Sequence, residues 1–568
     1  MLAPLGIAFI TALLASTLVA LTLTPVLCSY MLKPGTHATT PKEPAVSLKL
    51  RNIYTRALTW ALAHSRMMIY STGAALVLSV VVFSFLGRSF LPPFNEGSFT
   101  INVSTLPGIS LEESDRMGKQ VEKLLLEIPE IKTVGRKTGR AELDEHALGV
   151  NVSEIEAPFI LDNRSKDEVL HDIREKLAPL PGVNIEVGAP ITHRIDAMLS
   201  GTRANIAIKL FGTDLNRMFA IGNQVKESIK DIDGVTDLNV EQQVERPQLQ
   251  LRPKREMLAK YGITMAEFAN ITSVMLAGEE VSTVYEGNKV FPVTIKVADT
   301  DRSTIERIRK MPVDANGQKV PLENIAEVVS ATGPNTINRE NVSRKLVISA
   351  NVNNNDLVGT VKRIKEEIEK EVKLPEGYHI EYGGQFENEQ VASRTLLLTS
   401  ILSIAVIFLL LFGQFRNLRQ SAAILLNLPL ALIGGILAIA LSNDTISIPA
   451  VIGFISLFGI ATRNGMLLIS RYNDLERQGV PLMQRIMRGS TDRLNPIVMT
   501  ALTSALALVP LVVGGDLPGN EIQSPMAKVI LGGLFTSTLL NGFIIPIMYK
   551  NTHKPAPKAM SLTEKDKR

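Results

Sequence analysis

Seven apolar segments, each long enough to cross a bilayer as a helix, constrain the fold more than any other feature of the sequence. About 20 mostly apolar residues are needed to span the hydrocarbon. Polar residues 88–394 separate the second segment from the third, and 45% hydrophobic with 20% charged residues fits a chain shared between lipid and water. We therefore predict a multi-domain α-helical membrane protein with water-exposed α+β domains. The segments are 4–31, 67–87, 395–413, 420–441, 446–470, 495–514 and 526–549.

The placement of Lys and Arg predicts the orientation of these spans, because cytoplasmic loops carry an excess of both. Basic residues cluster in 32–66, 414–419 and 471–493, whereas the turns at 442–445 and 515–524 hold Asp444, Asp516 and Glu521 and neither Lys nor Arg. We expect the basic loops and the tail 550–568 to face the cytoplasm. The insert 88–394 is then periplasmic. Since the first segment, 1–31, lacks a basic start and a small-residue cleavage pattern, it is interpreted as a span rather than a signal peptide.

Two further features of the polar sequence limit the function. The formal net charge is only +4, from 60 basic and 56 acidic residues, so nothing indicates nucleic acid as a partner. The single cysteine, Cys28, can form no intrachain disulfide. The chain has no GxxxxGK[ST] loop, no CxxC pair and no Ser/His/Asp order, so we expect a protein that is not an enzyme and holds no cofactor.

The linker 32–66 contains a stretch, 50–62, in which apolar residues recur at helical spacing with basic residues between them. This pattern is typical of an amphipathic helix on the inner membrane surface, with Trp60 at the headgroups. A soluble linker helix is the alternative.

The insert repeats one pattern four times: a β-rich run, an amphipathic helix, then a short turn and a second β-rich run. We predict that the first two units form a ferredoxin-like βαβ subdomain within 88–190. The last two units, 191–240 and 341–394, form a second, split subdomain. Between them lies an inserted docking subdomain, 241–340, with a helix at Met265–Leu276 and a strand at 290–297. The leading β-rich runs are 98–105, 148–160, 204–211 and 345–352.

Four short motifs carry a family resemblance: Leu91-Pro92-Pro93-Phe94-Asn95-Glu96-Gly97, Ser104-Thr105-Leu106-Pro107-Gly108, Lys137-Thr138-Gly139-Arg140-Ala141-Glu142 and Gly383-Gly384-Gln385-Phe386-Glu387. With the span pattern, they resemble the heavy-metal efflux branch of the resistance-nodulation-division (RND) transporters over essentially the whole chain. Asn95 departs from that branch, which usually has Asp there. The resemblance covers the second half of such a pump, from its sixth span onward, so we expect half of an RND pump whose N-terminal half is missing.

The resemblance implies a proton-driven exporter of metal cations in the inner membrane of a Gram-negative bacterium. It also implies a homotrimer working with a periplasmic membrane-fusion adaptor and an outer-membrane channel. A final block, 395–549, would be a five-helix transmembrane domain.

Arg463 lies within the apolar span 446–470, where an arginine costs about 2.5–3.5 kcal/mol on insertion scales and therefore marks an ion path. The resemblance implies that it occupies the basic position of the tenth span of the full pump, which pairs with carboxylates of the fourth. Lysine is more usual there. We expect Asn464 and Thr500 to extend this proton relay, although Asn495 stands where the family often has Arg. No Asp or Glu lies inside the seven predicted spans. A position near the interface, with the arginine snorkelling, is the alternative.

Two periplasmic clusters carry groups that bind divalent transition metals, imidazole and carboxylate. The first contains Glu142, Asp144 and His146, and Glu154 and Glu156 lie near it in sequence. The second, which resembles the cleft segment of metal exporters, is made of the residues His193, Asp196 and Met198. Solvated acidic loops are the alternative for both.

The ion is left open among Zn²⁺, Co²⁺, Ni²⁺, Cd²⁺ and Cu⁺ or Ag⁺. Copper(I) exporters of this branch use methionines in the cleft, and the corresponding positions here are Asn102, Val150 and Ala197, with Met198 one residue away. The divalent ions are therefore favoured, although Ala197 replaces an acid common in their exporters.

Two other functions remain open at this point. The same machinery could export organic amphiphiles or drugs, but that use favours an aromatic cleft and only 5% of residues are aromatic. The chain could also be an inactive split half-transporter that acts only as an interaction partner, because the carboxylate span is missing.

Overall fold

The structure, a computed structural model, describes residues 3–31, 44–92, 94–106, 108–139, 149–191, 204–241, 245–334, 337–353, 356–442, 445–515 and 517–552. Several residues singled out above lie outside these ranges. They are Glu142, Asp144, His146, His193, Asp196, Ala197, Met198, Asp444 and Asp516.

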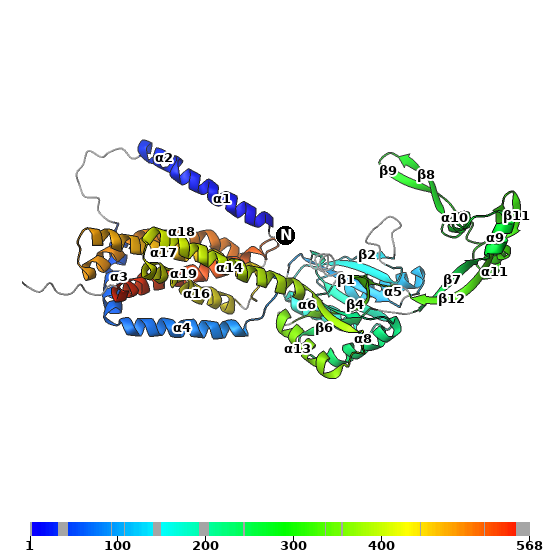
Figure 1. The fold of residues 1–568 in the computed structure, drawn as a ribbon, viewed down its shortest axis with the longest axis horizontal. Helices are drawn as coiled ribbons and strands as arrows, with labels where there is room; N and C mark the ends of the chain where they lie inside the picture. The colour runs from blue at the N-terminus through cyan, green and yellow to red at the C-terminus, as the bar shows by residue number, and fades with distance from the viewer. Residues whose placement is uncertain are drawn as a thin grey trace, which may run out of the picture.

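Figure 1 shows a bundle of long helices at one end of the molecule and the mixed α/β domains at the other. Among the described residues, seven helical segments are long and apolar enough to cross a membrane. The first is broken at Thr22 and the fourth at Leu426. The helices at this end are α1 (Ala3–Leu21), α2 (Leu23–Met31), α4 (Ser65–Phe85), α14 (Gln385–Phe415), α15 (Leu418–Leu425), α16 (Asn427–Leu441), α17 (Ile448–Arg477), α18 (Leu482–Val513) and α19 (Gln523–Thr552), and Figure 1 shows α1 and α2 apart from the packed bundle that the others form.

The centre of the bundle is the crossing of α16, α17 and α19, where glycines let the backbones approach closely. A Cβ added at Gly434 would lie 2.1 Å from the carbonyl oxygen of Gly532, and one at Gly533 would lie 2.0 Å from a methyl group of Leu457. Small residues at helix interfaces are typical of membrane bundles, in which close van der Waals packing replaces the hydrophobic effect. In contrast α2, α4, α14 and α18 keep most of their apolar side chains exposed or half-buried in this single chain.

Helix α3 (Ala45–Ala63) precedes α4 and lies against the bundle end of α18 and α19. Its buried face contains Tyr54, Leu58 and Leu62, while Trp60 is 51% exposed. The Tyr54 hydroxyl donates a hydrogen bond of 2.6 Å to the carbonyl oxygen of Gly542, which fixes α3 on α19.

The first α/β unit is a four-stranded antiparallel sheet in the order β2-β3-β1-β4, which is the order of a split βαβ sandwich. Phe99, Ile101 and Val103 alternate along β1 and point into a core covered by α5 and α6, because successive side chains of a strand face opposite sides. The elements are β1 (Ser98–Thr105), α5 (Leu111–Leu126), β2 (Gly135–Thr138), β3 (Val152–Pro158), α6 (Lys166–Leu177) and β4 (Val183–Gly188).

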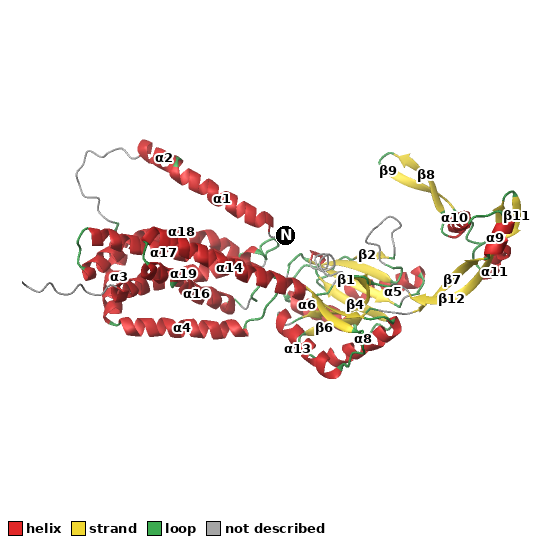
Figure 2. Ribbon diagram, viewed as in Figure 1, coloured by secondary structure: helices red, strands yellow, loops and turns green. Residues whose placement is uncertain are grey.

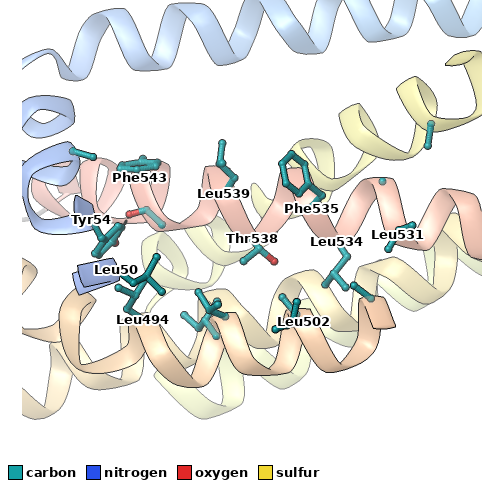
Figure 3. Close-up of a pocket in the computed structure, with 18 of the residues that line it drawn as sticks. Leu50, Tyr54, Leu494, Leu502, Leu531, Leu534, Phe535, Thr538, Leu539 and Phe543 are labelled. Atoms are coloured by element: carbon teal, nitrogen blue, oxygen red, sulfur yellow. Dashed lines mark hydrogen bonds between the residues drawn. The ribbon is translucent and has the colours of Figure 1, made fainter. Parts of the chain in front are cut away.

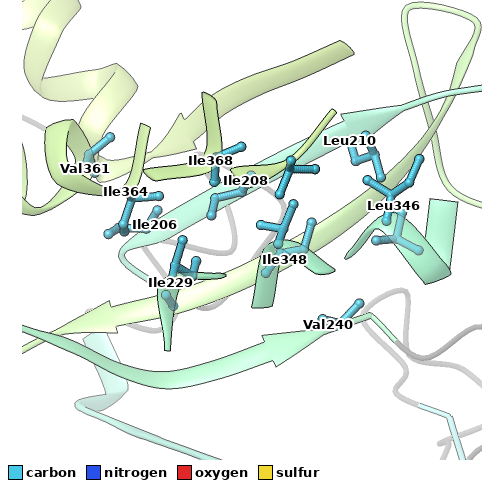
Figure 4. Packing of buried hydrophobic residues seen from close by; sticks show 14 of the residues in the cluster. Ile206, Ile208, Leu210, Ile229, Val240, Leu346, Ile348, Val361, Ile364 and Ile368 are labelled. Carbon is cyan, nitrogen blue, oxygen red and sulfur yellow. The ribbon is translucent and has the colours of Figure 1, made fainter. Parts of the chain in front are cut away.

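The second α/β unit repeats this order, with β6 paired to β14, β14 to β5 and β5 to β15. Figure 4 shows the core between the sheet and its two helices, where Ile208 and Ile348 meet Ile229 and Ile364. The elements are β5 (Ile206–Phe211), α8 (Leu215–Ile229), β6 (Val235–Val240), β13 (Arg339–Glu340), β14 (Ser343–Val352), α13 (Leu357–Glu371) and β15 (His379–Gly384).

A third unit is inserted between β6 and β14 and projects away from the sandwiches (Figure 2). A two-stranded ribbon of β7 and β12 leads to it, and a hairpin of β8 and β9, exposed along its whole length, extends from it. Its elements are β7 (Glu245–Pro253), α9 (Arg255–Tyr261), α10 (Met265–Leu276), β8 (Glu279–Glu286), β9 (Lys289–Ile295), α11 (Ile305–Lys310), β10 (Pro312–Ala315), β11 (Gln318–Pro321), α12 (Leu322–Ile325) and β12 (Ala326–Pro334).

Two direct connections join the helical bundle to the sandwiches. Strand β15 runs into α14 at Gly384, whose φ of +87° and close approach to the carbonyl oxygen of Asn205 exclude a side chain. At the other connection, residues 87–90 leave α4 and pair with the start of α17. The Ile446 amide donates to the Gly87 carbonyl at 2.9 Å, and the Ile448 amide donates to the Phe90 carbonyl at 3.2 Å.

Candidate functional site

Arg463 lies near the middle of α17, on a face that this chain leaves open. The face is exposed at both Gly459 and Arg463, one turn apart, and nothing lies within 4 Å of a Cβ placed on Gly459. Among the described residues, the Arg463 guanidinium has no hydrogen-bond or ion-pair partner. A cation at this depth with an open face beside it can receive anionic partners from another helix.

The two residues expected to extend the relay lie apart from this face. Asn464 is 1% exposed and points into the bundle, away from Arg463. The Thr500 hydroxyl, on α18, donates to the Ile497 carbonyl at 3.0 Å, a bond within its own helix. Asn495 lies near the middle of α18, where its side-chain NH₂ donates to the Ser47 hydroxyl of α3 at 2.6 Å. The structure therefore brings neither Thr500 nor Asn495 to the guanidinium.

A charged network at the inner ends of α17, α18 and α19 was not predicted from the sequence. Arg485 contacts the Glu476 carboxylate at 2.7 Å and the Tyr549 hydroxyl at 3.2 Å, and Arg471 contacts Asp492 at 2.6 Å. The sequence did contain a signal for this network, because acidic residues lie among the basic residues of segment 471–493. These pairs tie the three helices together at their inner ends.

The sheet of the first sandwich presents a polar face opposite its core. The strand register sets Asn102 between Glu154 on β3 and Glu186 on β4, and Glu154 opposite Lys137 on β2. Lys137 and Glu154 form an ion pair of 2.7 Å, and Asn102 is 3% exposed. The Glu186 carboxylate accepts a hydrogen bond of 3.2 Å from Ser349 of the second sandwich. This row of polar groups across the sheet lies where the two sandwiches meet.

The described residues contain no group of three or more His, Cys, Asp or Glu side chains that could hold a metal ion. Glu156, expected near the first candidate cluster, accepts hydrogen bonds from Thr100 at 3.2 Å and from Ser98 at 3.5 Å. Val150 is half-buried just before β3. Both candidate ligand clusters fall in 140–148 and 192–200, outside the described ranges, so their metal-binding role stays a prediction.

A second unpredicted feature joins the bundle to the sandwiches through residues 94–96. The Glu521 carboxylate, in the turn before α19, accepts a hydrogen bond from the backbone N–H of Asn95 at 3.1 Å. The Lys166 ammonium, on α6, donates to the Phe94 carbonyl at 2.7 Å. The Glu96 carboxylate accepts from the Ile191 amide at 2.8 and 2.9 Å. Burial raises the pKa of Glu96, against the effects of that amide and of Lys166. Burial likewise lowers the pKa of Lys166.

The bundle also has an apolar groove of about 910 Å³ between α3, α16, α18 and α19. Figure 3 shows Leu50 and Tyr54 at one end, Leu531 at the other, and Phe535 and Leu539 along its side. Its lining lacks carboxylates and imidazoles. The groove therefore has no ligands for a metal ion.

A bundle of membrane-length helices joined to α/β domains is the architecture of an RND permease. A family model described as the AcrB/AcrD/AcrF family matches residues 1–553, and the chain belongs to this family.

Two of the relatives are named as metal-resistance proteins. The chain is 31% identical to the cobalt-zinc-cadmium resistance protein CzcA of Cupriavidus metallidurans, over 97% of this chain and 53% of that protein. It is also 31% identical to the nickel and cobalt resistance protein CnrA of the same organism, over 99% of this chain and 54% of that protein. A crystal structure of a heavy metal efflux pump superposes with a TM-score of 0.75 at 28% identity, over 90% of this chain and 53% of that chain. The chain thus spans about half the length of these relatives.

Proposed function

We propose that this chain is the C-terminal half of an inner-membrane permease that exports divalent heavy-metal cations and is driven by the proton gradient. The relatives named for cobalt, zinc, cadmium and nickel resistance match it over nearly its whole length. Their other half supplies the remaining spans. The transport activity therefore belongs to the completed pump.

The observation that carries this proposal is the position of Arg463. It lies near the middle of an apolar helix, on an exposed face with nothing beside Gly459. A guanidinium keeps its proton, so the titrating groups must be carboxylates that approach this face. Protonation of those carboxylates would release Arg463, and their deprotonation would draw it back. Such a two-state contact can couple proton entry to movement of α17.

The polar row in the first sandwich supports a divalent ion rather than copper(I). Asn102, Glu154 and Glu186 offer oxygen donors, and thioether ligands are lacking in this row. Oxygen and imidazole ligands suit zinc, cobalt and nickel, whereas copper(I) prefers sulfur. We propose that the ion passes this row and is held by the carboxylates and imidazoles of 140–148 and 192–200.

The assembly proposed for the pump is a homotrimer with a periplasmic adaptor and an outer-membrane channel. The exposed apolar faces of α4, α14 and α18 leave ample surface for lipid and for the missing half. The docking insert, which projects away from the bundle, would be the part nearest the channel.

The test is metal resistance of a completed pump in a metal-sensitive host. This chain is fused to, or expressed with, the N-terminal half of the cobalt-zinc-cadmium relative, and survival is scored against zinc, cobalt, cadmium, nickel, copper and an organic dye. Resistance to the divalent ions is expected. Arg463→Ala should abolish it, Arg463→Lys should retain part of it, and Arg477→Ala, at an exposed inner position, should leave it unchanged. Resistance that survives in Arg463→Ala contradicts the proposed proton coupling, and resistance to the dye alone contradicts the substrate class.

One observation favours a second candidate, a half-transporter without activity of its own: the chain spans about half of each relative. Expression of the chain alone distinguishes the two. Resistance conferred by the chain alone excludes the inactive half. A chain that only co-purifies with an N-terminal half and confers no resistance in the completed pump supports it.

A further inference from the structure

Three asparagines lie in the interior of the helical bundle, one each on α16, α17 and α19. Asn427, Asn464 and Asn541 are each 1% exposed. All six of their amide nitrogen and oxygen atoms lack a hydrogen-bond partner among the described residues. Buried side-chain amides are nearly always paired, so three unpaired amides in one bundle need an explanation.

Helix register places the three side chains at one depth. Contacts along α17 and α19 advance together, from Leu457 with Gly533 to Gly465 with Ile545, so these helices are parallel. Asn464 lies seven residues beyond Leu457, which is two helical turns, and Asn541 lies one turn before Ile545.

Asn427 reaches the same level from the antiparallel helix α16. Along α16, Gly434 meets Gly532, and the Leu430 carbonyl accepts from the Thr536 hydroxyl at 3.3 Å. One turn further inward, a Cβ at Gly465 would lie 2.2 Å from the amide nitrogen of Asn427. Asn427 therefore occupies the space that the missing side chain of Gly465 leaves open. Gly465 directly follows Asn464 in the sequence, so Asn427 and Asn464 lie at the same depth.

The chemistry of six unpaired amide atoms selects the ligand. A metal cation would satisfy the three oxygens and leave the three NH₂ groups buried and unpaired. Water satisfies both, because each molecule donates and accepts. A buried water makes about three hydrogen bonds, so about two molecules would serve these six atoms.

We propose that Asn427, Asn464 and Asn541 form an internal water-binding site at the crossing of α16, α17 and α19. The site lies behind Arg463, since Asn464 follows Arg463 in α17 and points inward where Arg463 points outward. Bound water would give this part of the apolar core exchangeable protons. The proposal is independent of the direction or substrate of transport.

Radiolytic hydroxyl-radical footprinting tests the site directly, because X-ray pulses split bound water where it lies and the radicals oxidise adjacent side chains. Ile424 and Ile545, 0% and 1% exposed, both approach Gly465 and act as reporters. Ile436 and Ile439, 5% and 0% exposed, lie two or more turns outward in an apolar cluster and act as matched controls. In the full chain in lipid nanodiscs, oxidation of Ile424 and Ile545 should far exceed that of Ile436 and Ile439.

The variants Asn464→Leu and Asn541→Leu separate a hydrated layer from a dry one. If water is bound, leucine removes its ligands, so oxidation of Ile545 falls and the melting temperature does not rise. Dry, unpaired amides predict the opposite, because leucine, which branches at the same carbon, removes the unpaired polar atoms and raises the melting temperature. Equal oxidation of reporters and controls in the unmodified chain, or a higher melting temperature in both variants, overturns the proposal.

Discussion

At the scale of single residues, the first sandwich is stabilised by an ion pair between Arg164 and Glu130, which lies in the turn before β2. Glu130 is 7% exposed, and both its oxygens accept from Arg164, one of them at 2.8 Å from Nε. Arg164 also contacts Asp172 of α6 at 2.9 Å. The Arg164 guanidinium holds the pKa of Glu130 below its ordinary value of 4.5. Bidentate pairs of this geometry are stronger than ordinary surface ion pairs.

Glu130→Gln should lower the melting temperature of the chain at neutral pH and have less effect in acid. Because the folded pKa is depressed, the stability from Glu130 is fully present above the ordinary carboxyl value and is lost as pH falls through the folded pKa. Thermal unfolding followed at about pH 7 and about pH 3 measures this difference. Glu127→Gln, at a neighbouring exposed position, is the control. An effect of Glu130→Gln that is the same at both pH values contradicts the argument.

A single residue could be singled out from the sequence where the free-energy cost of its position does not depend on which residues lie beside it in the fold. Arg463 stands out in any apolar segment, and the structure leaves it on an open helix face. Asn427 and Asn541 could not be singled out, because one amide in an apolar helix gains meaning only when the helix register brings others beside it. The Glu96–Ile191 contact likewise joins positions far apart in sequence.

At the scale of elements, the glycine crossing of α16 and α19 makes a quantitative prediction. Gly434→Ala would place a methyl group 2.1 Å from the Gly532 carbonyl oxygen, so the helices must separate. We expect a loss of about 1–3 kcal/mol, the usual cost of overpacking. Gly73→Ala on α4, with nothing within 4 Å of its Cβ, is the matched control. Chemical unfolding in detergent measures both, and equal stability of the two variants would argue against a close crossing.

Helix α3 gives a second prediction, with a built-in probe. Leu58 is fully buried against the bundle, and Trp60, the only tryptophan of the chain, lies on the same helix. Leu58→Ala should cost about 2–5 kcal/mol and loosen the helix. Trp60 fluorescence should then shift to the red and become easier to quench. Ile53→Ala, at a 58% exposed position, should change neither property.

The bounds of a helix or strand were predicted well where one hydrophobic periodicity runs through the whole element. They were predicted poorly where a helix continues into water beyond its apolar part. The helix expected at Met265–Leu276 has those bounds in the structure. By contrast, α14 begins ten residues before the apolar segment 395–413, at Gln385. Hydropathy reports only the part of a helix that contacts lipid. The ribbon of β7 and β12 was not predicted, because its strands pair across the whole docking insert.

At the scale of the whole molecule, α14 is a continuous helix from the sheet of the second sandwich to the inner end of the bundle. One alanine inserted between Leu398 and Thr399 would rotate everything before it by about 100° relative to the rest. We expect the completed pump to lose metal resistance while the chain is still produced at normal levels, as judged by immunoblot. The same insertion between Gly287 and Asn288, at the exposed tip of the β8–β9 hairpin, should be tolerated. Full resistance in the first variant would mean that α14 does not couple the orientation of the second sandwich to that of the bundle.

The predicted domain bounds rest on a sequence pattern, because one βαβ pattern recurs four times and the gap between the third and fourth copies is long. The contact between the two sandwiches was not visible in the sequence, since it depends on side chains such as Arg174 and Asp237, which meet at 2.7 Å. Surfaces that join separately folded units carry no periodic signal.

The short backbone pairing of Gly87–Phe90 with Ile446–Ile448 links the movement of α17 to the chain that leads into the first sandwich. It joins the first residues of α17, the helix of Arg463, to the polypeptide that enters β1 eight residues after Phe90. A shift of α17 along its axis would act on the segment that leads into β1, in which the Asn95 backbone N–H and the Glu96 carboxylate are hydrogen-bonded to Glu521 and to Ile191. Displacement of that segment would move β1, and with it Asn102, relative to the neighbouring strands β3 and β4.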